Sequence, residues 1–151
     1  MTQINEPRAE GLVVVRGAAD GFVQEIVAGV HHLRSDEPRA VGGTDSGPTP
    51  YDLLLAALGS CTSMTVAMYA RRKQWPLERV TVRLRHSKVH AQDCAACEAV
   101  DAKLTVIDRE IAFDGPLGEE QRARLLAIAN RCPVHLTLTS RIDIRTRMIA
   151  S

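Results

Sequence analysis

Two cysteines that lie far apart in the sequence have neighbours that favour thiol chemistry. The first, Cys61, lies in an apolar stretch but is flanked by small and mostly polar residues, namely Gly59, Ser60, Thr62 and Ser63. Such neighbours fill a core poorly, but they leave room for a substrate and supply hydroxyl groups that could hold a thiolate. The alternative is a small core residue, because free cysteine is among the most buried residue types.

The second cysteine, Cys132, is followed directly by Pro133. Proline suits the first position of a helical turn, which would make Cys132 the N-cap, where free amides and the helix dipole lower the pKa of a thiol. Alternatively, Cys132 ends the preceding helix and Pro133 stops it. His135 could act as a general base, although a lone histidine more often has a structural role.

A third candidate site contains Cys94 and Cys97, with His90 four residues before the first cysteine. This spacing resembles part of a zinc site, but a structural zinc ion needs four ligands and no second ligand pair follows. The segment therefore has three interpretations: a metal site, a redox dithiol or a plain exposed loop. We favour the exposed loop.

The composition limits the classes of partner and the cellular compartment. The 151 residues are enough for one domain, which we place at residues 1–151. A formal net charge of +1 and 3% aromatic residues give no reason to expect a nucleic acid partner. The start of the chain lacks a signal peptide's apolar region, and small polar residues interrupt the apolar stretch at 53–70. We therefore expect no membrane partner and a cytoplasmic location, where cysteines stay reduced unless they do redox or metal chemistry.

The elements that would position these thiols alternate between strand pairs and helices. Apolar periodicity and turn residues predict a hairpin, a loop, a long helix, a second strand pair, a short helix and a final strand. The hairpin is placed at residues 11–16 and 22–30, the loop at 33–49 and the long helix at 50–73. The second strand pair is placed at residues 80–85 and 103–113, the short helix at 119–130, and the final strand passes through Ile142 and Ile144. A bulge is expected near Asp108-Arg109. Paired strands favour an α+β fold with antiparallel sheets.

The long helix is the best-defined element. Thr49 and Asp52 form the pattern of a capping box, and Pro50 suits the first helical position. Its residues are apolar or small on nearly every face, so it needs either a surrounding sheet or a second subunit to cover it.

The run from Gly47 to Cys61 and the later Arg131-Cys132-Pro133-Val134 resemble the OsmC/Ohr family, the osmotically inducible and organic hydroperoxide resistance proteins. The resemblance covers nearly the whole chain in order and is most similar to a divergent OsmC-like subgroup. It implies an OsmC-like fold with antiparallel sheets around a long central helix, in an intertwined homodimer.

The resemblance also implies a thiol peroxidase. In such an enzyme the Cys61 thiolate attacks a small organic hydroperoxide and becomes a sulfenic acid, Cys132 condenses with it to a disulfide, and an external dithiol reduces the disulfide. No metal or organic cofactor is needed. The alternative is an OsmC-like binding or redox-sensing protein with little peroxidase turnover.

The sequence departs from the best-characterised branch of that family at two positions. That branch has a Glu where this chain has Tyr51, and an Arg in the first hairpin turn, where this chain has none. Asp52 lies nine residues before Cys61, out of phase on a helix, so capping explains it better than a role at the thiol. Arg34 and Arg39, in the long loop, are the nearby cations that could replace the missing Arg.

Overall fold

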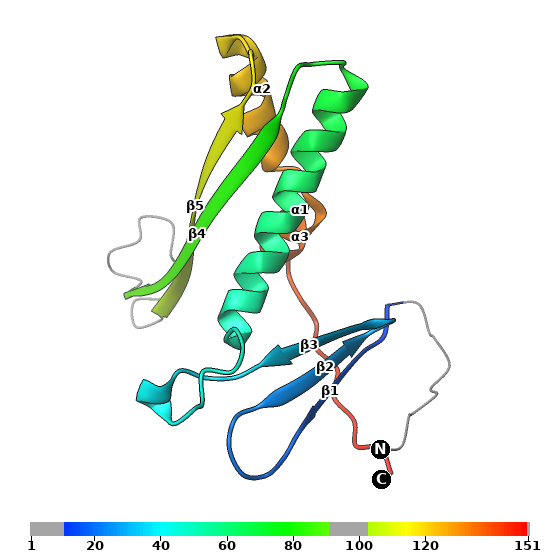
Figure 1. Cartoon of the computed structure of the whole chain (residues 1–151), viewed down its shortest axis with the longest axis vertical. Helices are drawn as coiled ribbons and strands as arrows, with labels where there is room; N and C mark the ends of the chain where they lie inside the picture. The colour runs from blue at the N-terminus through cyan, green and yellow to red at the C-terminus, as the bar shows by residue number, and fades with distance from the viewer. Residues whose placement is uncertain (1–10, 91–102, 151) are drawn as a thin grey trace. The chain divides into compact units, whose positions relative to one another are not determined.

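The computed structural model describes residues 11–90 and 103–150 and confirms the predicted α+β fold with antiparallel sheets (Figure 1). The chain divides into two compact units, residues 1–54 and residues 55–151. A single domain over residues 1–151 stays a prediction.

The first unit contains a three-stranded antiparallel sheet in the order β1-β2-β3. Its strands are β1 (Val13–Gly17), β2 (Gln24–Ala28) and β3 (His31–Ser35). The predicted hairpin is confirmed, but the loop predicted from residue 33 is wrong at its start, because β3 pairs with β2 there. The sequence His31-His32-Leu33-Arg34-Ser35 is too polar to suggest a strand, and backbone pairing across the turn at Gly29, whose φ is 63°, decides its conformation.

The loop after β3 contains the short 3₁₀ helix η1 (Arg39–Val41), and hydrogen bonds to the buried Asp36 carboxylate hold this loop together. Asp36 is 1% exposed and accepts hydrogen bonds from the backbone amides and hydroxyls of Thr44 and Ser46 and from the Glu37 amide. These bonds, the one from the Thr44 hydroxyl first, hold the pKa of Asp36 well below its usual range. Asp36 therefore has a structural role in this loop.

Helix α1 (Pro50–Arg72) begins and ends close to where the sequence predicts. The Thr49 amide donates to the Asp52 carboxylate at 2.9 Å and the Asp52 amide donates to the Thr49 hydroxyl at 3.1 Å, which is the predicted capping box. By length and composition alone α1 could cross a membrane, a test that core helices of globular proteins also pass.

The second unit contains a long hairpin of β4 (Arg79–His90) and β5 (Lys103–Asp114). Its register is continuous from Arg79 opposite Asp114 to His90 opposite Lys103, so the bulge predicted near Asp108-Arg109 is wrong. Without a bulge, side chains keep strict alternation along β5. Arg109 therefore lies on the same face as Ile111 and Phe113, which pack into the core.

A glycine lets α1 approach this hairpin closely. A Cβ atom added at Gly59 would lie 2.8 Å from Leu84 Cδ1, and Leu84 is the residue opposite Arg109 in the β4–β5 ladder. A larger residue at this position would have to displace the Leu84 side chain or widen the gap between the helix and the strand. Gly59 thus brings the middle of α1 within reach of the Arg109 side chain.

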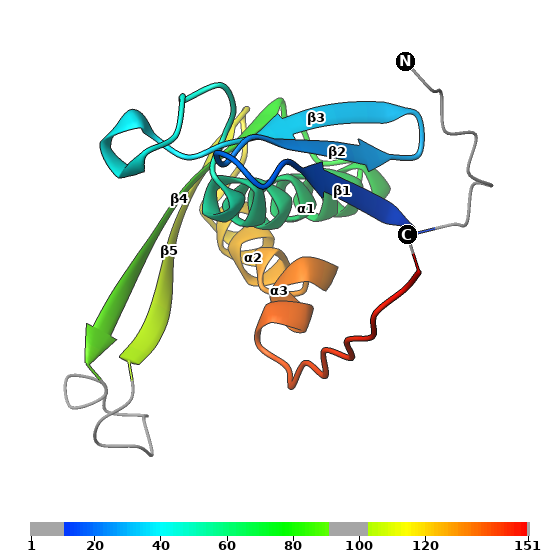
Figure 2. The ribbon, with the colours of Figure 1, turned by 90° about the horizontal axis from the view of Figure 1, so that it is seen from below.

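Helices α2 (Glu119–Ala129) and α3 (Pro133–Leu138) complete this unit and lie beside α1 (Figure 2). Its apolar core joins residues of α1, β5 and α2, with partly buried side chains packed around them. Arg122 of α2 ties the helix to the end of β5, because its guanidinium donates to the carbonyls of Phe113, Gly115 and Leu117. The buried core residues are Val66, Ala70, Phe113, Leu125, Ile128 and Ala129.

The predicted final strand through Ile142 and Ile144 is wrong, because residues 141–150 form no strand. Residues 141–150 have no strand partner among the described residues, and Ile144 and Met148 are 84% and 97% exposed. The apolar pattern is present, but a strand needs a neighbouring strand to pair with.

Truncation of the core residue Leu125 should destabilise the fold. Leu125 is fully buried, so Leu125→Ala should lower the free energy of unfolding by about 2–5 kcal/mol through lost burial and a residual cavity. Leu126→Ala is the matched control, because Leu126 is 53% exposed and should change stability by less than about 0.5 kcal/mol. Urea unfolding followed by circular dichroism measures both, and equal losses would contradict this assignment of the core.

Candidate active site

Cys132 is the N-cap residue of α3, with Pro133 at the first helical position, which confirms the N-cap interpretation. The His135 backbone amide donates a hydrogen bond to Cys132 Sγ at 3.2 Å. The Cys132 side chain is completely buried. A free helical amide that points at a buried sulfur stabilises the negative charge of a thiolate.

Cys61 lies on α1 directly before Thr62, whose hydroxyl contacts Cys132 Sγ, and Cys61 is partly exposed. The fold thus brings close together two free thiols that are about half the chain apart in the sequence. They differ in access, because only Cys61 reaches the surface. Their catalytic roles stay a prediction.

Thr62, the residue after Cys61, connects the thiol pair to the strands. Its hydroxyl has two acceptors within reach, the Leu58 carbonyl at 2.7 Å and Cys132 Sγ at 3.7 Å. The same oxygen accepts a hydrogen bond from Arg109 Nη1 at 2.9 Å. A hydroxyl carries one proton, so the bond from Arg109 occupies an oxygen lone pair, and the proton is shared between the nearer Leu58 carbonyl and the more distant Cys132 Sγ.

Arg109, on β5, is the site residue that the sequence interpretation missed. Besides Thr62, its guanidinium donates to the Ala129 carbonyl at 3.4 Å and to Asn130 Oδ1 at 2.8 Å. It also lies 3.3 Å from His135 Nδ1, which must be the acceptor because a guanidinium has only donors. The ring proton of His135 is thereby assigned to Nε2. A single side chain thus bonds α1, the end of α2 and α3.

The electrostatics of this cluster act on the Cys132 thiol. Burial alone would raise its pKa, because a charged sulfur loses hydration. Hydrogen bonds from the His135 amide, the Thr62 hydroxyl and the Cys61 side chain, together with the positive charge of Arg109, outweigh burial and lower the pKa of Cys132 below its usual value. Of the two thiols, Cys132 is therefore the one with identified groups that stabilise its anion.

The structure does not test the other residues predicted at the site. Tyr51, Asp52, Arg34 and Arg39 belong to the first unit, and the observed contact of Asp52 with Thr49 is a helix cap. Cys94 and Cys97 lie outside the described residues, and His90 ends β4. Within residues 11–90 and 103–150, no three metal-binding side chains cluster.

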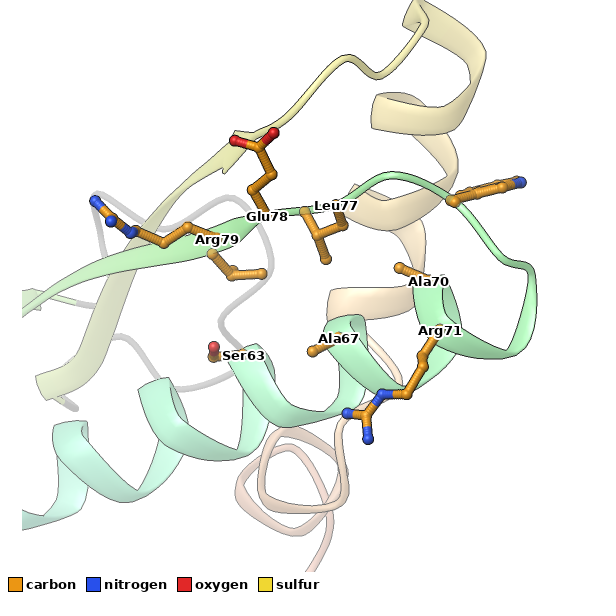
Figure 3. Close-up of a pocket in the computed structure, with 9 residues that line it drawn as sticks. Ser63, Ala67, Ala70, Arg71, Leu77, Glu78 and Arg79 are labelled. Carbon is orange, nitrogen blue, oxygen red and sulfur yellow. The ribbon is translucent and has the colours of Figure 1, made fainter.

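A depression of about 480 Å³ lies between the second half of α1 and the segment that enters β4 (Figure 3). Ser63, Ala67 and Ala70 face Leu77 and Val80 across it. Neither Cys61 nor Cys132 is among its lining residues, so it is separate from the thiol pair.

Comparison with known families gives one match. Residues 43–147 match the model of a family described as OsmC-like protein. The matched range contains both Cys61 and Cys132, and also Arg109. No curated protein matches the sequence significantly.

Solved structures resemble the fold at low sequence identity. An OsmC-like protein from Mycoplasma pneumoniae has a TM-score of 0.65 and 17% identity, over 83% of this chain and 84% of that one. The organic hydroperoxide resistance protein OsmC from Legionella pneumophila has a TM-score of 0.62 and 20% identity, over 87% and 90%. An organic hydroperoxide resistance protein from Elizabethkingia anophelis has a TM-score of 0.63 and 15% identity, over 87% and 89%. Such likenesses establish the fold.

Removing the Thr62 hydroxyl should make the Cys132 thiolate less stable. Thr62→Val keeps the side-chain shape but deletes the hydrogen bond to sulfur and should raise the pKa of Cys132. The thiolate fraction at low pH should fall about tenfold, since a hydrogen bond to a charged group contributes about 1.5 kcal/mol and 1.36 kcal/mol is a tenfold change. The titration is followed by the ¹³Cβ shifts of labelled cysteine. Thr65→Val, one turn further along α1, is the control; an unchanged Cys132 titration in Thr62→Val would refute this role.

Proposed function

We propose that this chain, which belongs to the OsmC-like protein family, reduces small organic hydroperoxides with its Cys61–Cys132 thiol pair. The family match confirms the resemblance predicted from the sequence. The observation that carries the proposal is the place of Cys61, partly exposed and directly before Thr62, whose hydroxyl contacts the buried sulfur of Cys132 together with the His135 amide. Two structures with this fold, from Legionella pneumophila and Elizabethkingia anophelis, are organic hydroperoxide resistance proteins, which supports this substrate class.

In the first step, the Cys61 thiolate attacks the terminal oxygen of the hydroperoxide. The new bond joins sulfur and oxygen, the O–O bond breaks, and the alkoxide takes a proton and leaves as the alcohol. Cys61 becomes a sulfenic acid. The partial exposure of Cys61 suits this role, because the substrate must reach the attacking sulfur.

In the second step, the Cys132 thiolate attacks the sulfenic sulfur of Cys61. A disulfide forms, the S–O bond breaks, and the hydroxide that leaves takes a proton to become water. An external dithiol then reduces the disulfide by two exchanges and restores both thiols. A cytoplasmic location, where dithiol reductants maintain free cysteines, is part of this proposal.

The functional unit in this proposal is a homodimer. Large apolar side chains remain exposed on α1, where Met64 and Met68 are 70% and 54% exposed, and along residues 141–150. A second copy of the chain would cover both of these apolar surfaces.

Substitution of either cysteine should affect turnover differently. Cys61→Ser should abolish reduction of cumene hydroperoxide by dithiothreitol, by more than about a hundredfold, because no sulfenic acid can form. Cys132→Ser should still form the sulfenic acid, which dimedone would trap, but should not form the intramolecular disulfide. Ser60→Ala is the matched control, because the Ser60 hydroxyl bonds back to the Ala56 and Ala57 carbonyls and should be dispensable.

Turnover that persists in Cys61→Ser would overturn the peroxidase proposal. One round of oxidation without further turnover in the wild type would instead favour a redox-sensing protein. The substitution of the family's Glu by Tyr51 is the observation behind this second candidate function.

Size-exclusion chromatography with light scattering should give twice the chain mass of 16.5 kDa. Ile144→Lys should shift the population toward the monomer, because it places a charge in the apolar C-terminal segment. Arg141→Lys, in the same segment, should leave the mass unchanged. A wild-type mass of one chain at micromolar concentration would contradict the dimer.

A further inference from the structure

We propose that Arg109 is a positioning residue that holds Cys132 as the resting thiolate, so that Cys132 accepts the proton of Cys61 and later closes the disulfide. This inference rests on the proposed peroxidase function for its second part. Its first part, the ionised state of Cys132, is a property of the reduced protein and is measured without any peroxide.

Arg109 has a positive charge whose observed acceptors are all neutral. Its four hydrogen-bond partners are a hydroxyl, a backbone carbonyl, an amide oxygen and an imidazole nitrogen. In the described part of the chain, no carboxylate forms an ion pair with it. A partly buried cation without a counter-ion is costly, and an adjacent group that can become an anion reduces that cost. In this cluster that group is the thiol of Cys132.

Two of the Arg109 bonds orient the groups that contact the sulfur. The bond to Thr62 Oγ1 turns the hydroxyl proton of Thr62 away from the guanidinium, toward its two acceptors, the Leu58 carbonyl at 2.7 Å and Cys132 Sγ at 3.7 Å. The bond to His135 Nδ1 fixes the residue whose backbone amide lies 3.2 Å from the same sulfur. Arg109 therefore acts through these two donors as well as through its charge.

The titratable and charged groups that face Cys132 come from three elements of the described structure. Cys61 comes from α1, Arg109 from β5 and His135 from α3 itself. The His135 ring accepts from Arg109 in the neutral form, so the guanidinium is the positive charge of this cluster. Its position is set by the uninterrupted register of the β4–β5 hairpin.

In this proposal one proton moves between the exposed thiol of Cys61 and the buried thiol of Cys132. In the proposed resting state, the Cys61 S–H is the proton donor to the Cys132 thiolate. Transfer of this proton leaves a thiolate on Cys61, the sulfur that a hydroperoxide can reach. After the O–O bond breaks, the alkoxide takes this proton from Cys132 and leaves as the alcohol. Cys132 is again a thiolate and attacks the sulfenic acid, releasing hydroxide that solvent protonates to water.

Cys132 ionisation should depend on the charge at position 109. In reduced protein with ¹³Cβ-labelled cysteine, Arg109→Gln keeps a hydrogen-bonding side chain but removes the charge and should lower the thiolate fraction at neutral pH about tenfold or more, as loss of a nearby opposite charge does. Arg109→Lys keeps the charge and should restore a large part of that fraction. Arg83→Met, on the outer face of the same hairpin, is the matched control and should leave the titration unchanged.

A single-turnover experiment separates ionisation from mere packing. With one equivalent of cumene hydroperoxide and no reductant, Arg109→Gln should accumulate dimedone-reactive Cys61 and close the disulfide about tenfold more slowly at pH 6. The rates should converge with wild type at high pH, where Cys132 ionises without help.

An unchanged Cys132 titration in Arg109→Gln would overturn the inference, and so would a slow closure that persists at every pH. If Arg109→Gln shifts the Cys132 titration but the wild-type protein does not reduce peroxide, the peroxidase proposal is overturned and the role of Arg109 at the thiolate stands. Thermal unfolding of each variant checks that it is folded. If Arg109→Gln fails to fold, a Cys132 titration in Arg109→Lys equal to that of a free cysteine would overturn the inference.

Discussion

A guanidinium group surrounded by neutral acceptors is the interaction on which the rest of the candidate site depends. Arg109 reaches from a strand to the Thr62 hydroxyl, to the end of α2 and to His135. These hydrogen bonds hold the Arg109 side chain in place. Among the described residues, no carboxylate pairs with its positive charge. The charge therefore acts on the one nearby group that can become an anion, the buried thiol of Cys132.

The surrounding fold serves to bring these groups within hydrogen-bonding distance. Gly59 allows α1 to approach β4, and the unbroken β4–β5 register turns Arg109 toward the helix. The Cys132-Pro133 step starts α3 and aims the His135 amide at the sulfur. These features are local, but the thiol pair exists only when all of them are combined. Differences in exposure then separate the two thiols, since Cys61 is accessible and Cys132 is enclosed.

Helix caps depend on adjacent residues and could be predicted from the sequence. Features that depend on how strands pair could not. The capping box at Thr49 depends on a few adjacent residues and is confirmed, and the structure confirms the N-cap at Cys132, one of two alternatives that the sequence leaves open. The sequence predicts a bulge near Asp108-Arg109, whereas the register is continuous and keeps Arg109 on the face of Ile111 and Phe113. A continuous strand with Val106 on the opposite face would have placed Arg109 beside Ile111. Strand β3 was missed because pairing, not composition, makes it a strand.

The central claim is that Cys61 and Cys132 act as one redox unit. The most direct measurement adds one equivalent of hydroperoxide to the fully reduced protein and identifies the oxidised cysteines by peptide mass spectrometry. We expect loss of two thiols per peroxide and a single disulfide between Cys61 and Cys132. Persistent reduced Cys132 beside oxidised Cys61, or a disulfide that joins either cysteine to another, would contradict it.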